Sequence, residues 1–128
     1  MVVDASVVIR FLTEDDPKKA QKFSQLLTSN KVKLEITDVT FAEIFWTLKS
    51  FYKAEKTKTL DALNSLINEP AVMCNFEILQ KTIELLINHN ISLIDAYTAT
   101  WAKKFSQGEV LSYDKDFDKL DSITRLEP

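Results

Sequence analysis

The chain contains very little glycine, histidine and cysteine, and each shortage excludes a class of site. Its 128 residues include one Gly, one His and one Cys. Dinucleotide-binding G-x-G-x-x-G turns and Walker-type phosphate loops need more than one glycine, so both are excluded. The single histidine excludes an H-E-x-x-H zinc site. The lone Cys74 excludes zinc clusters built on several thiolates and any internal disulfide.

Charge and hydropathy set further limits. The 16 basic and 19 acidic side chains give a net charge of −3, so a uniformly basic surface for nucleic acid is not expected, whereas a local basic patch remains open. Residues 1–4 carry no basic region, and no apolar run approaches the roughly 18 residues of a membrane span, so neither a signal peptide nor a membrane segment is expected. The length and the lone cysteine indicate a single cytoplasmic domain over residues 1–128.

Short apolar runs alternate with segments of helical periodicity along the whole chain. The runs predict strands at 2–4, 34–37, 72–74, 110–111 and 123–126. Between them, the spacing of apolar residues predicts a turn or short helix after Asp4 and helices over 17–29, 39–52, 56–68, 76–89 and 92–105. This alternation is typical of an α/β fold with a parallel sheet.

The segment from Val39 to Tyr52 is apolar almost all round, which predicts a buried helix. Its aromatic residues are expected in the core, with part of them in a subunit interface, since so apolar a helix has more surface than one small core can cover. These residues are Phe41, Phe45, Trp46, Phe51 and Tyr52.

Four acidic residues lie where solvated charges are not expected. Asp4 ends the first apolar run, and Glu43 lies within the most apolar helix. Asp95 falls in the first turn of a helix, and Asp114 follows the fourth strand. Parallel α/β sheets bind ligands at the carboxyl ends of their strands, where such acids can converge. A hard divalent cation would relieve their repulsion and accept phosphate oxygens, which favours hydrolysis of a phosphodiester.

Each acid also has a structural explanation. Asp4 can cap the segment that follows it, and Glu43 can form a buried ion pair with a lysine. Asp95 fits a Ser92-x-x-Asp95 capping box, a role compatible with ligation because a helix N-terminus favours negative charge. Asp114 can be a turn residue.

Four motifs resemble the PIN domain, and more narrowly the VapC-type toxins of bacterial and archaeal toxin–antitoxin pairs. They are D-A-S-V-V-I-R-F-L-T-E-D-D-P from Asp4, F-A-E-I-F-W-T-L from Phe41, L-I-D-A-Y-T-A-T-W-A from Leu93 and V-L-S-Y-D-K-D-F-D-K-L from Val110. Their order and spacing match the family over essentially the whole chain.

The resemblance implies a three-layer α/β/α sandwich around a mostly parallel five-stranded sheet. It also implies an endoribonuclease that depends on Mg²⁺ or Mn²⁺, a cognate antitoxin and a homodimer. The residues that match the family's acidic quartet are Asp4, Glu43, Asp95 and Asp114. In this scheme Asp4, Asp95 and Asp114 hold the metal, and Glu43 binds through water or positions the nucleophile.

The same motifs supply secondary candidates. Ser6 stands beside the first acid, and Ser112 precedes the last acid by two residues, as the family pattern has them. Asp116 can share or replace the role of Asp114. Arg10 is a candidate contact for RNA phosphates. A different class of function stays open, in which a PIN-like module only docks RNA or a protein and the acids merely cap helices.

Overall fold

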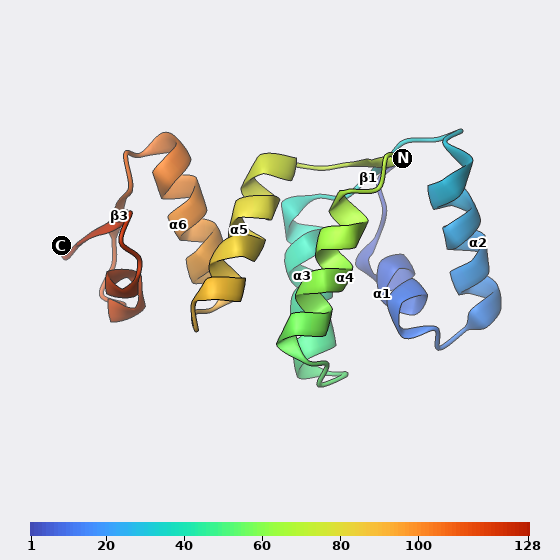
Figure 1. The fold of residues 1–128 in the computed structure, drawn as a ribbon, viewed down its shortest axis with the longest axis horizontal. Coiled ribbons are helices and arrows are strands. Elements are labelled where there is room, and N and C mark those ends of the chain that lie inside the picture. Colours follow the sequence, from blue (N-terminus) through green and yellow to red (C-terminus); the bar gives the residue numbers. More distant parts are fainter. The chain divides into compact units, whose positions relative to one another are not determined.

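The computed structural model describes residues 1–128, which form two compact units, Met1–Phe76 and Glu77–Pro128. Unit 1 contains α1 (Ala5–Thr13), α2 (Pro17–Ser29), β1 (Leu34–Glu35), α3 (Asp38–Ser50), α4 (Lys56–Ile67) and β2 (Val72–Met73) (Figure 1). From the boundary onward follow α5 (Phe76–Asn88), α6 (Leu93–Phe105), β3 (Glu109–Leu111), the 3₁₀ helix η1 (Lys115–Lys119) and β4 (Thr124–Leu126). None of these helices is long and apolar enough to cross a bilayer.

The helix starts in unit 1 follow from their capping residues. Asp16 caps α2 by accepting a hydrogen bond of 3.2 Å from the Lys19 amide, and Pro17 occupies the first turn, where a missing N–H costs little. Thr37 caps α3 by accepting a bond of 3.1 Å from the Thr40 amide. The segment after Asp4, expected as a turn or short helix, forms the nine-residue α1.

The four strands lie where apolar runs predicted them, whereas the run at 2–4 forms only an isolated bridge. The strands are very short and do not form one sheet. In unit 1, β1 pairs in parallel with β2, and Val2 forms a parallel bridge with Glu35 on the other side. In unit 2, β3 pairs in parallel with β4. The α/β class with parallel pairing is confirmed, whereas the expected five-stranded sheet is wrong for this structure. Strands of two or three residues offer few ladder bonds, and the pairing is confined to each unit.

The expectation of a buried helix holds for only one face of α3. Phe41, Ile44 and Leu48 form its buried face, whereas Trp46 is 66% exposed and Phe51 is 76% exposed. A helix buries only the face that packs against its neighbours, and the contact of α3 with α1 and α4 leaves its other face open. Apolar composition alone therefore did not identify which aromatic residues form the core.

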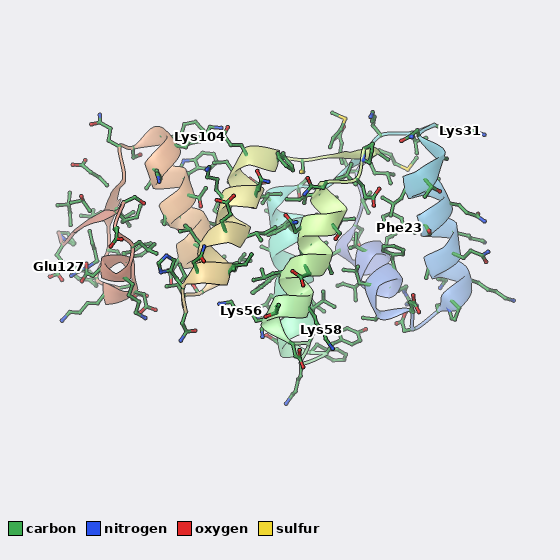
Figure 2. The ribbon with its side chains drawn as sticks, viewed as in Figure 1. Phe23, Lys31, Lys56, Lys58, Lys104 and Glu127 are labelled. Carbon is green, nitrogen blue, oxygen red and sulfur yellow. The ribbon has the colours of Figure 1, made fainter.

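In unit 2, side chains of α5 contact side chains of α6. Thr82 on α5 lies 3.4 Å from Thr100 on α6 through their hydroxyl oxygens, and both side chains are buried. Lys104, labelled near the end of α6 in Figure 2, pairs with Glu77 at the start of α5. The buried apolar residues of this unit are Ile78, Leu79, Ile83, Leu86, Ile91, Leu93, Ala96, Ala99, Ala102, Val110, Phe117 and Leu120.

The only glycine of the chain stands just before β3. Gly108 has a φ of +84°, and a Cβ added there would lie 2.5 Å from the carbonyl oxygen of Ser122. Its own carbonyl accepts a hydrogen bond of 2.9 Å from the Thr124 amide at the start of β4. This close approach of two backbones, together with the left-handed φ, explains why glycine is required here.

Candidate metal centre

Unit 2 brings three carboxylates together. Asp95 on α6, Asp114 before η1 and Asp116 within η1 each offer an oxygen, and these oxygens all lie within 4.8 Å of one another. The structure therefore joins two of the predicted quartet, Asp95 and Asp114, and adds Asp116, which the sequence offered as an alternative to Asp114. Two of the three acids of the last motif, Asp114 and Asp116, belong to the cluster.

Asp95 is held by the cap of its own helix. The Ser92 hydroxyl accepts a hydrogen bond of 3.1 Å from the Asp95 amide and donates one of 2.7 Å to the Asp95 carboxylate. The predicted capping interaction is thus present, and it fixes the carboxylate rather than consuming all its acceptor sites. The positive end of the α6 dipole further favours negative charge at this position.

Asp114 and Asp116 are ordered by a short chain of local hydrogen bonds. The Ser112 hydroxyl accepts from the Asp114 amide at 3.0 Å. The Asp114 carboxylate in turn caps η1 by accepting from the Asp116 amide at 2.8 Å. Lys119 places its ammonium 2.7 Å from Asp116 and offsets part of the cluster's negative charge. Ser112, predicted as a secondary site residue, therefore supports the loop that carries two of the acids.

The cluster suits a hard divalent cation. Oxygen ligands of octahedral Mg²⁺ lie about 2.1 Å from the ion, which puts pairs of ligands roughly 3 to 4 Å apart. The 4.8 Å limit on the oxygens of Asp95, Asp114 and Asp116 lies close to that range. Carboxylates this near to one another repel, and a divalent cation removes the repulsion. The donor set holds no sulfur or nitrogen, which favours Mg²⁺ or Mn²⁺ over softer metals.

In unit 1, Asp4 is the N-cap of α1. Its carboxylate accepts a bond of 3.0 Å from the Ser6 amide and a short one from the Ser6 hydroxyl. The Ser6 hydroxyl, and after it the Ser6 amide, lowers the pKa of Asp4 below its ordinary value of 3.8 because both stabilise the carboxylate form. The capping role suggested by the sequence is confirmed, and the Ser6 bonds stabilise the ionised carboxylate of Asp4.

Glu43 does not lie in the core, so the buried ion pair considered for it is absent. The side chain is exposed on α3, and no hydrogen bond or ion pair holds it. Val39 and Trp46 lie one turn before and after it on the same open face of the helix, and both are exposed. Glu43 is therefore a free carboxylate with apolar neighbours. Arg10, the candidate RNA contact, is likewise exposed, in the last turn of α1.

Comparison with known proteins agrees with the four motifs. The profile of the PIN domain matches residues 1–123. The chain belongs to the PIN domain family. A VapC ribonuclease from Aquifex aeolicus (strain VF5) is 23% identical over 124 residues, covering 93% of this chain and 90% of that protein.

The PIN match includes both units and all four acids of the predicted quartet. In this PIN domain, Asp95 and Asp114 belong to the oxygen cluster of unit 2, while Asp4 and Glu43 belong to unit 1.

Sequence reasoning missed one residue beside the acids of this PIN domain, Arg125 on β4. Its guanidinium bonds both carboxylate oxygens of Asp118, at 2.9 and 3.2 Å, and lowers the pKa of that group. It also donates to the Ser112 carbonyl at 3.0 Å and to Glu127 at 2.6 Å. The available signal was weak: a single arginine in a short apolar strand, next to a loop with three aspartates.

Proposed function

We propose that the protein is a metal-dependent endoribonuclease that hydrolyses RNA phosphodiester bonds with Mg²⁺ or Mn²⁺. The observation that carries this proposal is the oxygen cluster of Asp95, Asp114 and Asp116 in a chain of the PIN family. The similarity to a VapC ribonuclease supports RNA as the substrate. The PIN match across both units supports one functional domain over residues 1–128.

In this proposal Asp4, Asp95 and Asp114 hold the cation, and Asp116 shares the position of Asp114. A bound divalent cation would stabilise negative charge on the phosphate and lower the pKa of a water ligand. The protein's part is to keep the carboxylates ionised and in place. Ser6 favours the ionised form of Asp4, and Ser92 holds the carboxylate of Asp95 in place.

Glu43 has a different part, because its carboxylate is free. It orients the attacking water and accepts its proton as the water oxygen attacks phosphorus. The bond from phosphorus to the 3′ oxygen breaks in line with the attack, and that oxygen takes a proton from solvent water. The products carry a 5′-phosphate and a 3′-hydroxyl. An exposed base can then release its proton to solvent after each turnover.

Binding of the RNA requires cations outside the cluster. Arg10 is exposed in the last turn of α1, and α6 carries Lys103 and Lys104 in its last turn. Contacts of such side chains with phosphates release counterions, so the affinity for RNA should fall steeply as salt is raised.

The proposed setting is a type II toxin–antitoxin pair, with this chain as the toxin. We propose that a cognate antitoxin binds it and that two copies form a dimer. Apolar side chains that are exposed on α3 and just after it, Trp46 and Phe51, offer surface to a protein partner.

The decisive experiment compares the wild type, Asp95→Asn and the control Asp61→Asn on a labelled RNA. Asp61 is an exposed carboxylate on α4 outside the proposed site. Cleavage by the wild type and by the control should need Mg²⁺ or Mn²⁺ and stop with EDTA. Undiminished cleavage by Asp95→Asn, or in EDTA, would refute the proposal.

A second candidate is a PIN module that docks RNA or a protein without cleaving. It is favoured by the fact that Asp4, Asp95 and Asp114 all take part in helix caps. Titration with Mn²⁺ separates the two candidates. A nuclease centre binds Mn²⁺ and loses that binding in Asp95→Asn, whereas a set of caps binds none.

A further inference from the structure

We propose that Arg125 is a positioning residue for the metal centre: it holds the loop 112–118, and with it Asp114 and Asp116, beside Asp95. The inference rests on the proposed function and adds a residue that lies outside all four motifs of the acids. It starts from the contacts of one guanidinium group in unit 2.

The Arg125 guanidinium uses all three of its nitrogens. Nε and Nη2 bond the two oxygens of Asp118 in a bidentate pair, and Nη1 bonds the Ser112 carbonyl oxygen and the Glu127 carboxylate. The Arg125 side chain is only 12% exposed, whereas those of Asp118 and Glu127 are 52% and 54% exposed. The Arg125 side chain is thus largely buried, whereas its two carboxylate partners are exposed to solvent.

These contacts close the loop that carries the acids. Ser112 precedes Asp114 by two residues, and Asp118 follows Asp116 by two residues. Bonds from one planar guanidinium to both ends fix the span between them. The loop needs such support, because η1 has five residues and a 3₁₀ helix this short has little stability of its own.

The support acts against a defined force. Without a cation, the carboxylates of Asp95, Asp114 and Asp116 repel one another and tend to spread. Lys119 opposes this through Asp116, but its side chain is 51% exposed and makes a single ion pair there. A lysine at position 125 would offer a point charge instead of a planar fork and could not bond both ends of the loop in the same way.

Two carboxylates that share the same arginine provide a matched test. Asp118 lies in η1, whereas Glu127, labelled in Figure 2 near the C-terminus, lies outside the loop. We expect Asp118→Asn and Arg125→Lys to weaken Mn²⁺ binding, measured by calorimetry on the metal-free protein, by about tenfold or more. Glu127→Gln should change the Mn²⁺ affinity less than about twofold. Equal losses from Asp118→Asn and Glu127→Gln would overturn the inference.

The double variant Arg125→Lys/Asp118→Asn tests whether the two residues act together. Because both changes open the same link, the double variant should bind Mn²⁺ about as weakly as the worse single variant. Additive losses would mean that Arg125 does not act through Asp118. Circular dichroism and the midpoint of urea unfolding show whether either variant has lost its fold. Asp118→Asn is the milder change, because the asparagine side chain keeps one acceptor oxygen for Arg125.

Amide hydrogen exchange without metal tests the loop itself. The Asp116 amide, which is bonded to the Asp114 carboxylate, should exchange about tenfold faster in Arg125→Lys, while the buried Ala99 in α6 keeps its protection. Unchanged exchange at Asp116 would overturn the role of Arg125 and leave the nuclease proposal standing. Failure of the wild type to bind Mn²⁺, with faster exchange in the variant, would refute the metal centre and leave the loop's dependence on Arg125 intact.

Discussion

Unit 1 and unit 2 both contribute candidate acids, but they hold them in different ways. In unit 2, carboxylate oxygens of Asp95, Asp114 and Asp116 lie within 4.8 Å of one another. Ser92 bonds the Asp95 carboxylate, the Asp116 amide bonds the Asp114 carboxylate, and Lys119 pairs with Asp116. In unit 1, the carboxylate of Asp4 accepts hydrogen bonds from Ser6, and Glu43 has no partner. A metal ligand has to be fixed before the metal arrives, whereas a base has to stay free to exchange its proton. The acids of unit 2, together with Asp4 and its bonds to Ser6, suit the first task, and Glu43 suits the second.

The largest effect on RNA cleavage is expected at the acids of the unit 2 cluster. Asp95→Asn should lower the rate of RNA cleavage by about 1,000-fold or more, because the charge stabilisation that a bound cation supplies is worth several kcal/mol. Cleavage of a labelled oligonucleotide under single-turnover conditions measures the rate. The urea midpoint should stay near that of the wild type, since asparagine can still bond the Ser92 hydroxyl. If Asp95→Asn lowered the cleavage rate by less than about tenfold, the acids of the cluster would not differ from Glu43 in the way proposed.

A second prediction separates the two faces of α3. Phe41→Ala should cost about 3 to 5 kcal/mol of unfolding free energy, because it empties a buried position. Trp46→Ala, on the open face, should cost less than about 0.5 kcal/mol. Urea unfolding measures both. Sedimentation of Trp46→Ala should show a weaker dimer if that face is the subunit interface, and an unchanged dimer would place the interface elsewhere.

The third prediction concerns the free acid. Glu43→Gln should lower the cleavage rate by about 100-fold while leaving the Mn²⁺ affinity and the urea midpoint unchanged, since loss of a base slows proton transfer only. Glu55→Gln, another exposed carboxylate of unit 1, serves as the control and should cleave like the wild type. Loss of Mn²⁺ binding in Glu43→Gln would show that Glu43 is a ligand and would remove the contrast between the units.

The smallest effect is expected at Asp16, which caps α2 and is not among the acids of the proposed site. The Lys19 amide lowers the pKa of this carboxyl below 3.8, so the folded state binds its proton more weakly than the unfolded state. The resulting stabilisation is complete above pH 3.8 and is lost as the pH falls through the lower pKa of the folded protein. Asp16→Asn keeps a cap at pH 7 but lacks this acid-dependent part, so its urea midpoint should fall less than that of the wild type between about pH 5 and about pH 2. A steeper fall would contradict this explanation.

Much of the fold could be predicted from local signals. The Asp16-Pro17 pair and Ser92 marked helix starts correctly, and the short apolar runs marked every strand. Local signals do not determine which strands pair, so the five-stranded sheet was expected where two separate pairs occur. For α3, periodicity identified the helix but not its buried side, because apolar residues surround it and only packing decides which of them are enclosed.

The site was predictable where acids lie next to their own supports. The pair of Ser92 and Asp95 and the spacing from Ser112 to Asp114 could be read along the chain. The choice between Asp114 and Asp116 could not, because it depends on how η1 turns. Arg125 could not be found either, since its bonds to Ser112 and Asp118 span 13 and 7 residues and exist only once β4 pairs with β3.

The protein is expected to be sensitive to substitution of Gly108, although this residue takes no direct part in metal binding or catalysis. Any side chain there meets the backbone at Ser122, three residues before Arg125, so relief of the clash would shift the strand that presents the guanidinium. A random mutational selection for inactive protein should therefore recover replacements of this glycine along with changes in the acids. Such isolates would retain all the proposed metal ligands and still be inactive, because even one added methyl group at position 108 displaces the backbone that carries Arg125.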